Sequence, residues 1–136
     1  MAKFIEVKME HSSELFNIEI INYIIEFEEK AVLNTGKDFI FTKSAYEQIV
    51  GILKYHDFVK SEFNGSTIHI NGLDTNNKGV EAFVNVNALG HLFGTWQGEL
   101  KFKDGTEVES YFSPGAMRDS LQIKQNSLIL EPKKFS

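Results

Sequence analysis

Two stretches of the sequence, 16–25 (FNIEIINYII) and 84–93 (VNVNALGHLF), share one pattern, and this pattern decides the fold. Each is followed by further strand-like residues and then by a glycine turn, at Thr35–Gly36 and at Asp104–Gly105. Alternating apolar and polar residues favour β-strands, and glycine turns between such runs favour hairpins. The sequence therefore predicts two β-meanders of the same kind.

The spacing of the matching positions predicts an internal duplication. Gly36 and Gly105 are separated by the same number of positions as Ser44 and Ser113. Matching positions of the two opening stretches are one residue closer together, and one inserted residue near 96–98 accounts for the difference. Two repeats are too few for an open solenoid, so we expect the units to pack on each other around a shared core.

A helix is predicted after each turn. Ser44 and Glu47 have the spacing of a capping box, in which each side chain bonds a free backbone N–H. Four apolar residues then recur at helical spacing: Tyr46, Ile49, Val50 and Leu53. This pattern predicts a helix over about 45–56. In the second unit, Ser113 as N-cap and Pro114 at the first helical position predict a shorter helix.

These elements define the expected fold class and domain organisation. We predict an α+β protein in which two tandem β-meander plus helix units form one compact, mainly antiparallel β body with two helices. The first unit spans 1–57 and the second 58–123, and a C-terminal tail of 124–136 contains a short candidate strand at 128–130. The length of 136 residues also fits one globular domain.

Composition narrows the classes of function. The net charge is −5, and Arg118 is the single arginine among the 14 basic residues. Arginine makes the commonest bidentate contact to guanine, so an acidic chain with one arginine argues against a nucleic acid partner. The absence of cysteine excludes disulfides and thiol catalysis. No segment has the length of a membrane span, and the N-terminus lacks the apolar run of a signal peptide, so we expect a cytoplasmic protein.

Several stretches of the first half resemble small bacterial FlbD-like proteins. They are 3–7 (KFIEV), 16–18 (FNI), 24–26 (IIE) and 44–49 (SAYEQI), with a glycine turn before the last. The resemblance covers about 50 residues and recurs in part in the second half. It implies a short β-meander followed by a helix, apparently in two tandem copies, in a bacterial or phage-like chain. It implies no catalytic residues.

A second resemblance is to the LytTR DNA-binding domain, which is also rich in strands and glycine hairpins. That family carries an arginine and a histidine in the stretch after its first helix. The corresponding stretch here is 58–62 (FVKSE), which has neither and ends in Glu62. This departure argues further against DNA binding.

No catalytic, metal or cofactor motif is present in the sequence. The four histidines, His11, His56, His69 and His91, lack the spacing of a zinc site. His69 alternates with apolar neighbours and is a candidate to face a cleft. The carboxylate pairs 26/28 and 107/109 have period-two spacing, which is typical of a solvated sheet face. We therefore predict no catalytic residues, no metal and no cofactor.

Aromatic residues supply the candidate binding site. Trp96 lies between two glycines, and tryptophan and tyrosine are common anchors of binding interfaces. We predict that Trp96 binds a partner together with Phe93, His91 and Tyr111. These residues fall in 90–111, where the second copy differs most from the first.

The leading hypothesis from the sequence is a non-enzymatic binding protein that engages another protein, of an inhibitor or immunity type. The first alternative is a LytTR-like DNA-associated transcriptional regulator, and the second is a small hydrolase. We expect a protein partner and no membrane association. A homodimer formed through exposed edge strands stays open.

Overall fold

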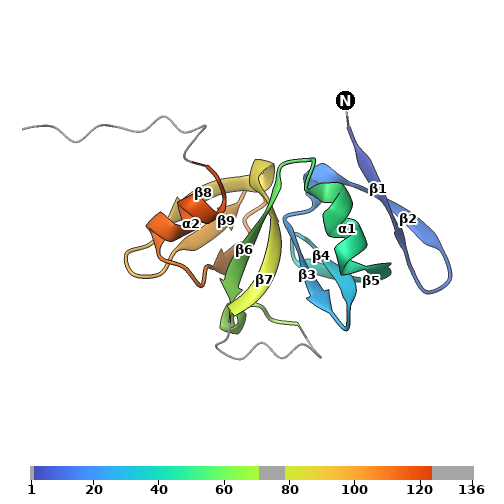
Figure 1. Ribbon diagram of the computed structural model, residues 1–136, viewed down its shortest axis with the longest axis horizontal. Coiled ribbons are helices and arrows are strands. Elements are labelled where there is room, and N and C mark those ends of the chain that lie inside the picture. The colour runs from blue at the N-terminus through green and yellow to red at the C-terminus, as the bar shows by residue number, and fades with distance from the viewer. Residues whose placement is uncertain (1, 71–78, 124–136) are drawn as a thin grey trace, which may run out of the picture.

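The chain forms ten β-strands, two α-helices and three short 3-10 helices within the residues that the structure, a computed structural model, describes: 2–70 and 79–123 (Figure 1). The first half contains β1 (Phe4–Lys8), β2 (Ser13–Asn17), η1 (Ile18–Ile20), β3 (Tyr23–Phe27), β4 (Lys30–Thr35), β5 (Asp38–Ala45) and α1 (Tyr46–Leu53). The second half contains β6 (Phe58–Asn64), η2 (Gly65–Thr67), β7 (Gly79–Asn85), η3 (Val86–Ala88), β8 (Leu89–Phe93), β9 (Glu99–Phe102), β10 (Glu107–Glu109) and α2 (Pro114–Ser120).

The strands form three sheets, and every strand pair in them is antiparallel. The largest sheet has five strands in the order β5-β4-β3-β7-β6, the second has the order β10-β9-β8, and β1 and β2 form a separate hairpin. These sheets and the two helices confirm the predicted α+β class. Because β3 pairs with β7, the five-stranded sheet contains strands from both predicted units.

The order of elements repeats along the chain. A hairpin (β1–β2, then β6–β7) is followed by a 3-10 helix, a three-stranded meander and an α-helix. Asn17 and Asn85 hold the same place in this order, since each accepts a hydrogen bond from the backbone N–H two residues on and caps a 3-10 helix. The repetition of elements does not by itself establish a duplication, which stays a prediction.

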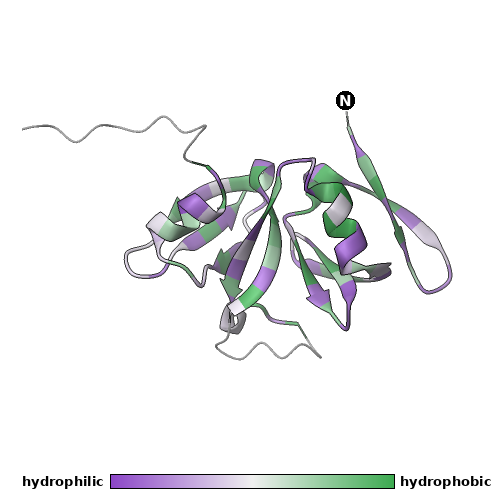
Figure 2. Ribbon diagram, in the orientation of Figure 1, coloured by the Kyte–Doolittle hydropathy of each residue, from purple (hydrophilic) through white to green (hydrophobic). Residues whose placement is uncertain are grey.

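The core lies on both faces of the five-stranded sheet. Successive residues of a strand point to opposite faces, so Ile24 packs in one cluster and its neighbours Tyr23 and Ile25 pack in the other. One face is covered by α1 and the β1–β2 hairpin, and the other by the three-stranded sheet and α2. This double burial explains why the central strands contain runs of apolar residues, seen as green bands in Figure 2.

The two helix starts differ in how they are capped. Ser113 is the N-cap of α2 and accepts a hydrogen bond from the N–H of Ala116 at 3.4 Å, as predicted. The capping box predicted at Ser44 does not form, because Ala45 is the N-cap of α1 and no side chain bonds there. Ser44 Oγ instead accepts a hydrogen bond from the N–H of Lys8 at 2.9 Å, which ties the β1–β2 hairpin to β5.

Helix α1 is shorter than predicted and ends at Leu53. No helix in the described part of the chain is long and apolar enough to cross a membrane. The candidate strand at 128–130 lies outside the described residues.

Candidate nucleic-acid interface

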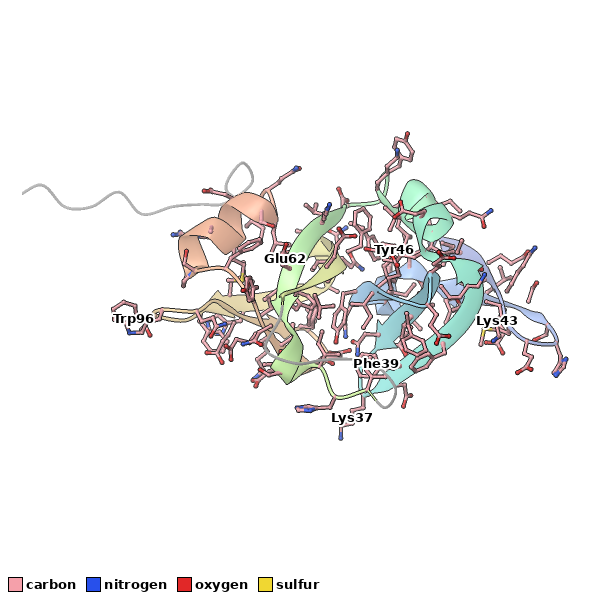
Figure 3. All side chains as sticks on the ribbon, turned by 60° about the horizontal axis from the view of Figure 1, so that its bottom comes forward. Lys37, Phe39, Lys43, Tyr46, Glu62 and Trp96 are labelled. Carbon is pink, nitrogen blue, oxygen red and sulfur yellow. The ribbon has the colours of Figure 1, made fainter. Side chains whose placement is uncertain are left out.

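Of the four residues predicted to form a binding site, the structure places three in β8 and the loop that follows it, and places Tyr111 elsewhere. Trp96 is 92% exposed in the loop between β8 and β9, which projects from one end of the molecule (Figure 3). His91 and Phe93 lie on one face of β8 with their ring centroids 4.6 Å apart. Tyr111 lies elsewhere, beside β6, where its N–H donates to the carbonyl oxygen of Glu62 at 3.0 Å.

The base of the Trp96 loop is fixed by two glycines. Gly94 has a φ of +127°, and a Cβ there would overlap the carbonyl of Gln97. A Cβ on Gly98 would lie 2.8 Å from the end of the Met117 side chain in α2. The loop is thus anchored at its base, while the indole at its tip lies in solvent.

A second and larger feature lies at the edge where the turns of both halves meet. One cleft has a volume of about 890 Å³, and a cleft of about 540 Å³ shares Gly36 and Asp104 with it. A third cleft of about 220 Å³ shares Glu19, Asn85 and Asn87 with the first. These three adjoining clefts form one surface, which we call the turn groove.

The floor of the turn groove is a row of buried asparagines on β7, at the start of β3 and on β4. Asn22, Asn34 and Asn85 are each no more than 3% exposed. The side-chain amide of Asn22 donates to Asn34 Oδ1 at 2.9 Å, and that of Asn34 donates to the carbonyl oxygen of Gly36 at 3.1 Å. The amide of Asn85 donates to the carbonyl oxygens of Ile18 and Ile21. Buried amides with their hydrogen bonds made hold the surrounding backbone in one arrangement.

This row also binds the turn between β9 and β10. The Asn22 amide donates to Asp104 Oδ2 at 2.9 Å and lies 3.4 Å from Thr106 Oγ1. Asp104 Oδ1 accepts the backbone N–H of Thr106 at 2.9 Å. Partial burial acts to raise the pKa of Asp104, but the hydrogen bonds from Asn22 and Thr106 outweigh it, so the pKa lies below its ordinary value. The carboxylate is therefore ionised in this position at neutral pH.

Three lysines line the groove: Lys3, Lys37 and Lys103. All three are exposed, and Lys37 points into solvent at the edge of the molecule (Figure 3). The ion pairs within residues 2–70 and 79–123 are Lys60–Glu81 and Lys101–Glu107, so none of the three groove lysines is paired there. His69, a candidate to face a cleft, lines the second cleft. Exposed and unpaired lysines are available to an anionic ligand.

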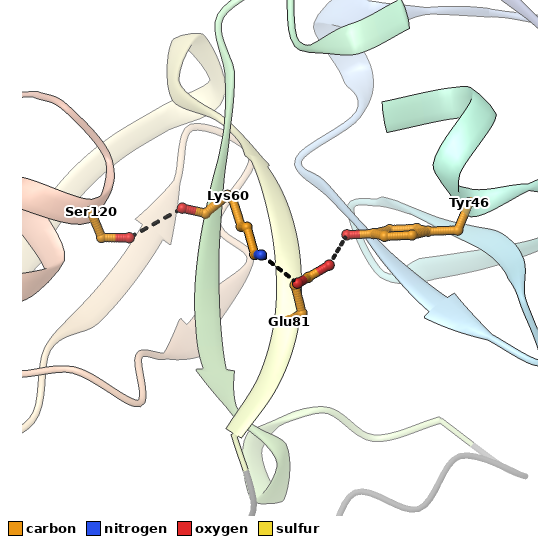
Figure 4. A network of polar contacts seen from close by, with 4 residues as sticks. All are labelled: Tyr46, Lys60, Glu81 and Ser120. Carbon is orange, nitrogen blue, oxygen red and sulfur yellow. Dashed lines mark hydrogen bonds and ion pairs between the residues drawn. The ribbon is translucent and has the colours of Figure 1, made fainter. Parts of the chain in front are cut away.

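Acidic side chains gather at the opposite ends of the central strands. The β3–β4 turn contains Glu28 and Glu29, both with positive φ, and the carbonyl oxygen of Glu29 accepts the N–H of Tyr46 where α1 begins. Figure 4 shows the Tyr46 hydroxyl donating to Glu81 at 3.1 Å, while Lys60 pairs with the same carboxylate at 2.9 Å. Burial of Tyr46, followed by the charge and hydrogen bond of Glu81, raises the pKa of its hydroxyl.

The sequence alone missed the turn groove. Its three buried asparagines interrupt apolar runs at 20–25, 31–35 and 82–89, and this polar interruption was the available signal. A sequence does not show that Asn22 bonds a turn that lies far along the chain in the other half. Within the described residues, no group of three or more His, Asp or Glu side chains is placed to hold a metal ion.

Comparison with known proteins identifies a fold shared with a class of DNA-binding domains. No protein-family model and no curated protein matches the sequence. Among solved structures, the chain is similar to the LytTr DNA-binding domain of a Bacillus cereus protein described as a putative methyl-accepting/DNA response regulator. The TM-score is 0.51 and the identity 16%, over 87% of this chain and 95% of the other. At this identity the likeness shows that the two chains share a fold.

The comparison corrects the prediction about partners. The sequence argued against a nucleic acid, and this prediction is wrong, because a chain with the same fold is a DNA-binding domain. The argument used the charge of the whole chain, whereas binding depends on the charges of one face. The stretch 58–62, whose missing arginine counted against DNA, lies in β6 and does not line the turn groove.

The same comparison favours the LytTR-like alternative over the leading hypothesis of an inhibitor or immunity protein. The FlbD-like resemblance, the hydrolase alternative and the role of Trp96 as a partner anchor are not tested by it and stay predictions.

Proposed function

We propose that this protein is a DNA-associated regulator of LytTR-like type and that it binds duplex DNA with the turn groove. The observation that carries the proposal is the LytTR-like fold, which extends over 87% of the chain. A groove formed by turns from both halves of the same fold supplies a surface for the DNA.

The chemistry of the groove supports this proposal. Protein–DNA contacts are made mainly by lysine and arginine to phosphates and by amides and hydroxyls to phosphates and base edges. The groove offers the ammonium groups of Lys37 and Lys103, the exposed amide of Asn87 and the hydroxyl of Thr106. These groups come from separate turns and a short helix, so a rigid duplex could meet several of them at once.

The groove is lined by charges of both signs. Two of the carboxylates that line the groove are already engaged, since Asp104 accepts from Asn22 and Asp57 accepts from the Asn87 amide at 3.1 Å. The glutamates of the β3–β4 turn lie at the other end of the strands. A duplex at the groove therefore meets three lysines together with four carboxylates, of which Glu107 is paired with Lys101. With few cations on the face, we expect weak non-specific binding and a modest dependence on salt.

The experiment that tests the proposal is selection of the full chain against a random-sequence duplex library, followed by fluorescence anisotropy with the recovered duplex. The proposal predicts enrichment of one sequence motif and binding that weakens as salt is raised. The matched control is a protein with Lys37 and Lys103 both changed to Gln, which should bind more weakly. Recovery of no duplex at low salt would contradict the proposed function.

We also infer that the two units arose by duplication. The repeated order of elements, the matching caps at Asn17 and Asn85 and the meeting of the turns at Gly36 and Asp104 support this inference. It predicts that units 1–57 and 58–123 of related chains align with each other when many such sequences are compared.

A further inference from the structure

Asp104 is a negative charge in the middle of a groove that is proposed to bind a polyanion. A carboxylate facing DNA ordinarily weakens binding, because like charges repel. The hydrogen bonds of Asp104 indicate a different role for this side chain. The inference developed from them rests on the proposed function.

Both oxygens of the Asp104 carboxylate are used as acceptors. Oδ2 accepts the amide of Asn22 from the five-stranded sheet, and Oδ1 accepts the N–H of Thr106 within the turn. Asn22 is 3% exposed and also donates to Asn34, so its position is fixed by the sheet. The turn that carries Lys103 is thereby fastened across the gap between the two sheets.

The partner turn is fastened to the same asparagine row. The Asn34 amide donates to the carbonyl oxygen of Gly36, which directly precedes Lys37. A Cβ on Gly36 would lie 3.5 Å from Asp104 Oδ2, so the two turns are in close approach. One connected set of hydrogen bonds thus sets the separation of the two lysine-bearing turns.

Only a carboxylate satisfies both donors. An asparagine at position 104 has one acceptor oxygen, and its NH₂ group would face either the Asn22 amide or the Thr106 N–H, donor against donor. The side chain at position 104 would then keep only one of the two hydrogen bonds that fasten the turn. The change also removes a negative charge, which by itself would strengthen DNA binding.

We infer that Asn22 and Asp104 are positioning residues, which clasp the two turns so that Lys37 and Lys103 are held at a fixed spacing for DNA phosphates. Asp104 is then an acidic side chain that increases affinity for DNA. This role is one of pre-organisation, in which ordering the binding groups before contact lowers the cost of association.

The test compares Asp104→Asn with Glu19→Gln in the full chain. Glu19 lines the same cleft, is exposed and has no hydrogen-bond or ion-pair partner for its carboxylate among the described residues. Affinity is measured by fluorescence anisotropy on the duplex recovered from the random library, over a range of salt concentrations. We expect Asp104→Asn to bind the duplex about tenfold more weakly, which corresponds to the loss of one net hydrogen bond. We expect Glu19→Gln to bind the duplex about twofold more tightly.

A second control separates positioning from general stability. The amide of Asn64 donates to Glu109 Oε1 at 3.2 Å and also joins the two sheets, but Asn64 does not line the groove. Asn64→Ala should lower the melting temperature and leave affinity unchanged. Asn22→Ala should weaken DNA binding and reduce the slope of log K against log salt by about 0.9 for each phosphate that a lysine no longer neutralises.

The outcomes distinguish this inference from the proposed function. If the wild type binds and Asp104→Asn binds as tightly as Glu19→Gln or more tightly, Asp104 is only a charge and the inference is overturned. If Asn64→Ala and Asn22→Ala weaken binding equally, the clasp is only structural, which also overturns it. If the wild type binds no duplex, the proposed function fails first and the inference falls with it. Hydrogen exchange at the Gly105 amide, which donates to the carbonyl oxygen of Phe102 at 2.9 Å, shows in each variant whether the turn still folds.

Discussion

Gly36 of the β4–β5 turn lies directly against Asp104 of the β9–β10 turn, and a Cβ on Gly36 would be 3.5 Å from the carboxylate. The turns meet although they are far apart in the chain, and Gly36 has a φ of +74° that favours glycine. The meeting of these two turns creates the centre of the turn groove.

Replacing Gly36 by alanine should destabilise the protein and disturb the groove. The left-handed conformation costs an L-residue about 1–2 kcal/mol, and the added methyl group fills space between the turns. Gly105→Ala is the matched control, because Gly105 has a φ of +94° but a Cβ there would meet no atom within 4 Å. Denaturant unfolding should show similar losses in both variants, while DNA affinity should fall further in Gly36→Ala. Equal affinities would show that the meeting point does not matter for binding.

Ser44 and Ser113 should respond differently to replacement by alanine. Ser113→Ala removes the N-cap of α2 and should cost about 1 kcal/mol. Ser44→Ala leaves the N–H of Lys8 without its acceptor and should release the β1–β2 hairpin from β5. Hydrogen exchange should therefore quicken in residues 4–17 of Ser44→Ala and not in α1. Faster exchange confined to 46–49 would instead show that Ser44 acts as a helix cap.

Stability should fall at alkaline pH because of two buried tyrosines. Burial raises the pKa of Tyr23, and burial followed by Glu81 raises that of Tyr46, above the ordinary value of 10.0. A group whose pKa is raised on folding contributes stability that is fully present below its unfolded pKa and is lost as pH rises above it. Unfolding of the wild type should therefore become easier above about pH 10.

Tyr46→Phe tests the cause of this pH dependence. The change removes the hydroxyl that donates to Glu81 and should cost about 1 kcal/mol at neutral pH. It should also reduce the loss of stability above about pH 10, as followed by urea unfolding at a series of pH values. Tyr55→Phe is the control, since Tyr55 is 77% exposed and should change neither quantity. An unchanged alkaline profile in Tyr46→Phe would contradict the assignment.

Trp96→Ala should leave stability within about 0.5 kcal/mol of the wild type, because the indole is 92% exposed. Trp96 is the single tryptophan of the chain, so its fluorescence reports on the β8–β9 loop alone. Acrylamide should quench it freely in the unbound protein, and quenching should persist when the groove binds DNA. Protection of the indole by the duplex would extend the DNA interface to this loop.

Local patterns in the sequence were sufficient to predict much of the fold. The glycine turns at 35–36 and 104–105 form hairpins, and Ser113 with Pro114 begins α2, because each depends on neighbouring residues alone. The pairing of β3 with β7 was not predictable from pattern, since it joins strands from opposite halves of the chain. Ser44 fits a capping box by spacing, but the nearby hairpin offers its hydroxyl a different donor.

The candidate site was harder to predict from the sequence than the fold. Trp96 was predicted to anchor a partner; its exposure shows that it does not belong to the core, and its role in binding stays a prediction. The turn groove depends on Asn22 and Asp104, which are 82 positions apart and have no motif that links them. The charge of the whole chain does not describe any one face, because the groove carries three lysines and four carboxylates while the glutamates of the β3–β4 turn lie at the other end of the central strands.

The salt dependence of DNA binding tests the central claim most directly. Lys37→Gln and Lys103→Gln remove groove charges, while Lys43→Gln removes an exposed charge on β5 that does not line the groove. The slope of log K against log salt is negative. We predict that each groove variant reduces its magnitude by about 0.9 and that Lys43→Gln leaves it unchanged. Equal slopes in all three variants and the wild type, or a reduced slope confined to Lys43→Gln, would contradict the assignment of the turn groove as the DNA-binding face.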